Sequence, residues 1–179
     1  MARHQSTIHG GIDGSHLMRL GDAERTCKMI LASPKDRKDI WTSIFLRKGK
    51  NGAYTRLFNS LEPSQQHMLL DVVGLRDTEL AVIGSVRNPE KWLVVTTERV
   101  VWSIGGNRNV VAVGEISHIK ADIPSPEAKK NLHELQIVTM TGKTYLIELE
   151  PGAPLMGVWN VLVNMARRNR TAMKKANLN

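Results

Sequence analysis

The second half of the chain is a succession of short β-strand patterns that closes with one amphipathic helix, and this order limits the possible folds more than any other feature. Between about Glu79 and Pro151, apolar or alternating runs are separated by turn signals such as Asn88-Pro89-Glu90 and Gly105-Gly106-Asn107. The predicted strands cover residues 80–86, 92–96, 99–104, 110–113, 116–121, 132–140 and 144–149. A helix follows from Leu155. Seven strands at this short, regular spacing indicate an α+β domain, in which an antiparallel barrel or sandwich is followed by the C-terminal helix.

The residues before the strands favour helices. One is expected at Asp22–Leu31, and Ser33 is a predicted N-cap with Pro34 at the first helical position. Two further helical pieces are expected at Tyr54–Asn59 and from Pro63 to Gly74. The expected organisation is a flexible N-terminal arm at 1–20, a helical region at 21–75, the barrel with its capping helix at 76–168, and a basic tail at 169–179.

The composition indicates a soluble protein of the reducing cytoplasm. Its 179 residues suffice for one proper core, and a single cysteine, Cys27, cannot form an internal disulfide. The longest nearly apolar stretch, Pro154–Ala166, is shorter than the ~20 residues needed to span a bilayer. The N-terminus has histidines and an aspartate where a signal peptide has an apolar run. We therefore expect a cytoplasmic location.

The net charge of +8 is concentrated at the two ends of the chain. Residues 1–50 hold ten Lys and Arg against five Asp and Glu, and residues 155–179 hold five Lys and Arg with no acid. The predicted strands at 80–154 hold eight of each sign. An uncompensated basic cluster attracts polyanions, although such a run is also common as a solvated surface.

Several residues of the strand region match a known pattern. The run Trp92–Trp102, which contains Thr96, Arg99 and Trp102, resembles the "TxxRLxW" hairpin of bacterial pleckstrin-homology-like (PH-like or GRAM-like) domains. A Glu115-Ile116 step, a Thr141-Gly142-Lys143 hairpin and a final helix with Trp159 follow in the same order as in those domains. The resemblance covers roughly residues 76–168.

This resemblance implies a seven-stranded bent barrel, closed at one end by the final helix, that binds proteins or lipids and has no catalytic activity. Members that bind phosphoinositides use a basic cluster at the first hairpin. This chain has Arg87-Asn88-Pro89-Glu90-Lys91 there, and Glu90 dilutes the charge. The sequence therefore departs from the pattern for inositide recognition.

The sequence contains no convincing signature of catalysis, metal binding or a cofactor. His4, His9 and His16 have gaps that match no helical or strand face, and no carboxylate cluster accompanies them. No Gly-x-Ser-x-Gly motif is present, and Gly105-Gly106 reads as a turn. We expect a non-enzymatic protein without metal or cofactor.

The four tryptophans are predicted mainly to pack in the core. Trp41, Trp102 and Trp159 fall at positions expected to face inward. Trp92 begins its strand beside Lys91 and could instead offer an exposed surface on which a base stacks.

Three functions are compatible with these patterns. The first is a binding module whose basic termini contact the phosphates of RNA or DNA. Its candidate nucleic-acid-binding residues are Arg167, Arg168, Arg170, Lys174, Lys175, Lys48 and Lys50. The second is a protein-interaction module, such as an adaptor or an inhibitor of an acidic partner. The third is peripheral attachment to an anionic membrane, which the diluted first hairpin disfavours.

Overall fold

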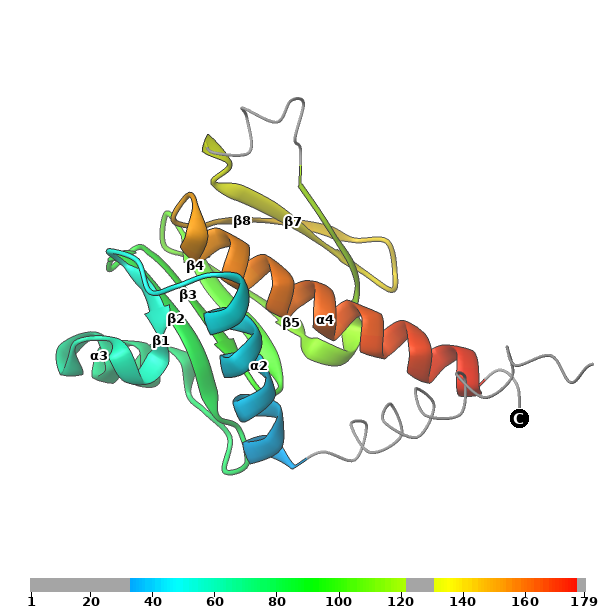
Figure 1. Ribbon diagram of the computed structural model, residues 1–179. Coiled ribbons are helices and arrows are strands. Elements are labelled where there is room, and N and C mark those ends of the chain that lie inside the picture. Colours follow the sequence, from blue (N-terminus) through cyan, green and yellow to red (C-terminus); the bar gives the residue numbers. More distant parts are fainter. Residues whose placement is uncertain (1–32, 122–130, 177–179) are drawn as a thin grey trace, which may run out of the picture. The chain divides into compact units, whose positions relative to one another are not determined.

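Two antiparallel sheets and a long C-terminal helix make up most of the protein that the computed structural model describes, residues 33–121 and 131–176 (Figure 1). The five-stranded sheet has the order β1-β2-β3-β4-β5 and the three-stranded sheet the order β6-β7-β8. Their strands are β1 (Thr55–Leu57), β2 (Ala81–Asn88), β3 (Lys91–Thr96), β4 (Arg99–Ile104), β5 (Asn107–Ala112), β6 (Ile116–Lys120), β7 (Glu134–Thr139) and β8 (Thr144–Glu148). The α+β class and the seven predicted strands, β2 to β8, are confirmed.

Among the described residues, three α-helices accompany the sheets: α2 (Pro34–Lys48), α3 (Pro63–Val73) and α4 (Ala153–Ala176). The predicted start of α2 is confirmed, because Ser33 and Asp36 form a reciprocal capping box and Pro34 opens the helix. Helix α4 continues well past the boundary expected from the sequence. Residues 169–176, expected as a tail, are therefore helical. The expected arm at 1–20, the helix at Asp22–Leu31 and Cys27 lie outside the described residues.

The expected helical piece at Tyr54–Asn59 is wrong. Residues Thr55–Leu57 form β1, the eighth strand, and a short 3-10 helix, η2 (Phe58–Ser60), follows it. β1 pairs with β2, and the buried hydroxyls of Thr55 and Ser85 lie 2.8 Å apart. The carboxylate of Glu150 accepts the backbone N–H groups of residues 53, 54 and 55 at 2.7–2.9 Å. These distant partners override the local preference for a helix.

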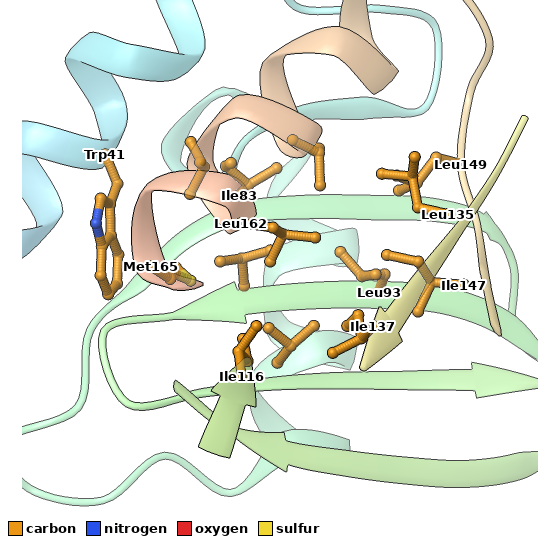
Figure 2. Close-up of a cluster of buried hydrophobic side chains, with 14 of the residues drawn as sticks. Trp41, Ile83, Leu93, Ile116, Leu135, Ile137, Ile147, Leu149, Leu162 and Met165 are labelled. Carbon is orange, nitrogen blue, oxygen red and sulfur yellow. The ribbon is translucent and has the colours of Figure 1, made fainter. Parts of the chain in front are cut away.

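One large apolar cluster joins α2, α4 and the inner faces of both sheets (Figure 2). In Figure 2, Trp41 of α2 and Met165 of α4 lie at one end of the cluster, and Leu135 and Ile147 of the second sheet lie at the other. From α4, the predicted residues Leu155, Val158, Leu162, Met165 and Ala166 are buried. Trp159 packs against the edge of this cluster, as expected for an inward-facing residue, but it is only half-buried.

A second apolar cluster covers the opposite face of the five-stranded sheet. Leu69 and Val73 of α3 pack there with Trp92, Val94 and Val101. Strand β4 therefore contributes to both clusters, since its neighbouring residues point to opposite faces. The central strands are buried on both sides.

The described strands do not close into a barrel. No strand of the five-stranded sheet is hydrogen-bonded to a strand of the three-stranded sheet within the residues that the structure describes. The two sheets instead meet through the side chains of the large cluster. The sequence predicted the strands correctly, but the hydrogen-bonded closure that defines a barrel is not present among them.

A buried ionic network fastens α3 to the turn between β3 and β4. The guanidinium of Arg99 donates to both oxygens of Glu79 at 2.9–3.2 Å and to the carbonyl oxygen of Gly74 at 2.7 Å. Glu79 also accepts from the Thr96 hydroxyl and from the backbone N–H of Arg76. Burial by itself raises the pKa of Glu79, but these hydrogen bonds and the charge of Arg99 outweigh it and hold the pKa below its ordinary value.

Candidate functional site

Helices α2 and α4 pack side by side and run antiparallel (Figure 1). The last turn of α2 meets the first turn of α4, where a Cβ at Gly157 would lie 2.6 Å from a ring carbon of Phe45. At Gly49, which ends α2, a Cβ would lie 2.5 Å from the carbonyl oxygen of Ala153. Neither distance is tolerable, so the close approach of the two helices requires glycine at both positions.

This helix pair carries most of the uncompensated charge of the described residues. Helix α2 has five Lys and Arg with two Asp, and α4 has five Lys and Arg with no acid. One of the two acids, Asp36, is held in the cap by Ser33, whose side-chain and backbone hydrogen bonds lower its pKa. Several cations in or beside the sheets, in contrast, are matched by acids in the pairs Arg99–Glu79, Lys91–Glu148 and Arg76–Glu98.

A groove of about 310 Å³ lies between the two helices, and its charged lining is entirely basic. Its cations are Arg47 and Lys48 from the last turn of α2 and Arg167 from α4. Ile44, Asn160, Val163 and Asn164 complete the lining. The structure thus brings together two residues predicted from the sequence, Lys48 and Arg167, which are 119 positions apart.

The other predicted residues lie outside this groove. Arg170 and Lys174 are exposed further along α4, at helical spacings that keep them near the side of Arg167. Lys50 is exposed just beyond the end of α2. Arg168 and Lys175 are half-buried. Burial lowers the pKa of the Arg168 guanidinium, and the neighbouring positive charge of Arg37 lowers it further.

Three polar residues of the groove, Arg47, Asn160 and Asn164, were not predicted from the sequence. Arg47 directly precedes the predicted residue Lys48 and lies with it on the last turn of α2. Asn160 and Asn164 interrupt the apolar pattern of α4 at a spacing of one turn. That spacing was a signal that one stripe of the helix is polar.

A second cavity, of about 360 Å³, lies at the edge where the two sheets meet. Arg87 and Lys91 contribute to its lining, as do Trp102 and Glu148. The ammonium of Lys91 forms an ion pair with Glu148, so one of these two cations is already neutralised. This cavity is much less basic than the groove between the helices.

Of the eight aromatic residues of the chain, five are buried, and Tyr54, Tyr145 and Trp159 are half-buried. Trp41, Trp92 and Trp102 are buried, with Trp92 only 7% exposed within the second apolar cluster. The alternative in which Trp92 stacks on a base is therefore wrong. No aromatic residue lines the groove between the helices, which offers charge and hydrogen bonds to a ligand.

Comparisons with protein-family models, with curated proteins and with solved structures find no match. Of the helices that the structure describes, none is both long and apolar enough to cross a membrane. The described residues also contain no group of three or more His, Cys, Asp or Glu that could hold a metal ion. His4, His9 and His16 lie outside the described residues.

Proposed function

We propose that this protein is a non-catalytic binding module that holds a nucleic acid by its phosphates, through the basic surface of α2 and α4. One observation carries the proposal: basic segments from distant parts of the sequence converge on one helix pair, around a groove without an acidic side chain. Arginine and lysine on such a surface bind phosphate and release the counterions of the polyanion.

The spacing of the cations on α4 suits an extended polyanion. Arg167, Arg170 and Lys174 span about 10 Å of helix at 1.5 Å per residue. A nucleic-acid duplex carries one negative charge per ~1.7 Å of its axis. Several phosphates can therefore lie within reach of α4, while Arg47 and Lys48 contact a further one from α2.

The experiment is a titration of the full chain with fluorescently labelled RNA and DNA duplexes at several salt concentrations, followed by anisotropy. We expect the logarithm of the affinity to fall linearly with the logarithm of the salt concentration. Replacement of Arg167, Arg168 and Arg170 by alanine should make that slope shallower. Absent or salt-independent binding would contradict the proposal.

Further arms of the same titration test the two alternatives, a protein-interaction module and attachment to an anionic membrane. A peptide of consecutive glutamates tests an acidic protein partner, and vesicles with anionic lipid test membrane attachment. Binding of the peptide or the vesicles at least as tightly as the nucleic acid, at matched ionic strength, would replace the proposal by the corresponding alternative. Lys91 lies in the first hairpin, where members of the resembled family that bind phosphoinositides have a basic cluster. Its ion pair with Glu148 neutralises this charge, which favours the nucleic acid over a lipid headgroup.

We also propose that residues 76–168 have a PH-like architecture and that the protein acts in the cytoplasm. Support for the architecture comes from the order of β2 to β8 followed by a helix that packs in the core of both sheets. Nuclear Overhauser contacts from the methyl groups of Leu155 and Leu162 to only one sheet would contradict this architecture.

The proposed location in the cytoplasm is supported by the single cysteine. A labelled full-length protein found outside the cytoplasm would contradict it.

A further inference from the structure

We propose that Thr171 is a phosphorylation site, and that a phosphate group on its hydroxyl weakens nucleic-acid binding by neutralising the basic surface of α4. The phosphoryl donor is a nucleoside triphosphate held by a protein kinase that selects basic substrates. The inference rests on the proposed function, because it names a regulation of the same surface.

The sequence around Thr171 is that of a basic kinase substrate. Thr171 follows the run Arg167-Arg168-Asn169-Arg170, so arginine stands one, three and four positions before the hydroxyl. Kinases that select basic substrates bind such arginines, above all the one three positions before the acceptor, with carboxylates beside their active site. Among the serines and threonines of residues 33–121 and 131–176, Thr171 is the only one with Lys or Arg at that position.

The end of α4 can open for a kinase without any loss of the core. Ala166 is the last buried residue of α4, and none of residues 167–176 is buried. In Figure 1 the last turns of the helix extend beyond the two sheets. Opening the helix there breaks two hydrogen bonds that the Asn169 amide donates to backbone carbonyl oxygens outside the helix, and the exposed bond of the Thr171 hydroxyl to a carbonyl one turn earlier. The extended conformation that a kinase binds is therefore accessible at Thr171.

The reaction is a phosphoryl transfer. The Oγ1 atom of Thr171 attacks the γ-phosphorus of the nucleoside triphosphate, and the bond from that phosphorus to the oxygen bridging to the β-phosphate breaks. The nucleoside diphosphate leaves with the bonding electron pair, and the hydroxyl proton passes to a carboxylate of the kinase. The product is a phosphate monoester with a charge of about −1.5 to −2 at pH 7. A helix without an acidic residue thereby gains a strong anion.

This phosphate lies among the cations that we propose to bind nucleic acid. Arg167 is four positions before Thr171 and Lys174 is three positions after it, so the three residues share one face of α4. Arg167 also lines the groove between α2 and α4. A phosphate on Thr171 attracts these two cations and repels the phosphates of a polyanion. It therefore competes, from within the chain, for the charges that bind the nucleic acid.

The first arm of the test asks whether Thr171 is modified. The full chain is incubated with magnesium, ATP and the catalytic domain of an arginine-directed serine/threonine kinase, and mass spectrometry locates the phosphate. We expect phosphate on Thr171 and none at this position in Thr171→Val. Incorporation at Thr171 should be about tenfold slower in Arg168→Ala, which removes one charge-assisted contact with the kinase.

The second arm asks what the phosphate does to binding. Anisotropy titrations with the labelled RNA and DNA duplexes compare the phosphorylated chain and Thr171→Glu with the unmodified chain. We expect the slope of log affinity against log salt concentration to become shallower by about 2 for the phosphorylated chain and by about 1 for Thr171→Glu. The matched control is Thr144→Glu, which places the same charge on the exposed end of β8 and should leave the slope nearly unchanged.

The outcomes separate this inference from the proposed function. The absence of phosphate on Thr171, or equal affinities of the phosphorylated and unmodified chains, would overturn the inference. An effect of Thr144→Glu as large as that of Thr171→Glu would also overturn it, because net charge alone would then explain the loss. All three results leave the proposed function standing if the unmodified chain binds with a salt-dependent affinity. If the unmodified chain binds neither duplex, both proposals fall.

The central comparison does not depend on how a variant folds. The phosphorylated and unmodified chains have the same sequence, and Thr171 lies beyond the last buried residue of α4. Thr171→Val, which has no hydroxyl, should bind both duplexes within about twofold of the unmodified chain before and after incubation with the kinase. A loss of affinity in Thr171→Val after that incubation would mean that another modified residue causes the effect, and would overturn the inference.

Discussion

The five-stranded sheet and the α2–α4 helix pair differ in how they use their surfaces. The central strands of the sheet are covered on both faces by apolar clusters, and charged residues at its rim, such as Arg99 with Glu79, are matched in pairs. The helix pair is covered on one side by the large cluster and presents a basic groove on the other. The two regions share one core, but the charged lining of the groove between the helices is entirely basic, whereas the cavity at the sheets includes the ion-paired Lys91 and Glu148. Stability and binding are therefore expected to respond to different mutations.

The largest expected effect is on the sheet side. Replacement of Glu79 by glutamine leaves the largely buried guanidinium of Arg99 without its carboxylate partner, and we expect the free energy of unfolding to fall by about 3–5 kcal/mol. Urea denaturation measures this loss. The control is Glu98→Gln in the more exposed pair with Arg76, where we expect a loss of about 1 kcal/mol or less.

That variant also tests the separation of the two regions. Under conditions where Glu79→Gln remains folded, its affinity for nucleic acid should equal that of the wild type, because Glu79 does not line the groove. If the affinity for nucleic acid falls in proportion to the free energy of unfolding, stability and binding are not controlled by separate regions.

A smaller loss is expected where the two helices touch. Gly157→Ala places a Cβ against the ring of Phe45, and the forced shift should cost about 1–3 kcal/mol of unfolding free energy. Because the shift moves α2 away from α4, it should also weaken nucleic-acid binding at temperatures where the sheets stay folded. Gly114→Ala is the matched control, since nothing lies within 4 Å of a Cβ there. Equal melting temperatures for the two variants would contradict the close approach of the helices.

The pH dependence of stability should arise partly from the buried carboxylate. The hydrogen bonds from Arg99 and Thr96 hold the pKa of Glu79 below its ordinary value in the folded protein, so folding favours its charged form. Its contribution is fully present above the unfolded pKa and is lost as the pH falls through the folded pKa. We expect denaturation experiments at decreasing pH, from neutral to about 3, to show a shallower decline for Glu79→Gln than for the wild type. An identical decline would assign the acid sensitivity to other groups.

The parts of the structure that the sequence predicts are those determined by local patterns. The strands β2 to β8 follow from alternation and turn residues, such as Gly105 and Gly106, which adopt positive φ angles of 57° and 79°. The start of α2 follows from Ser33 and Pro34. β1 was missed because its strand conformation depends on Glu150 and on β2, which lie far away in the sequence.

The sequence predicted some of the charged residues of the candidate site, but not how they are arranged. Lys48 and Arg167 were chosen for their charge, but their position around one groove depends on the close approach at Gly49 and Gly157. No local pattern reveals that contact. Lys50, chosen on the same grounds of charge, lies outside the groove because α2 has already ended at Gly49.

The central claim is that the charges of the helix pair, and not those of the sheets, bind the polyanion. Two triple variants that remove the same formal charge test it: Arg47, Lys48 and Arg167 to glutamine on the helices, and Arg87, Lys120 and Lys143 to glutamine on the sheets. The measurement is the slope of log affinity against log salt concentration for the RNA duplex. We expect the slope to become shallower by about 3 for the helix variant and to change by less than about 1 for the sheet variant. An equal change in both variants would contradict the account, because binding would then follow net charge alone.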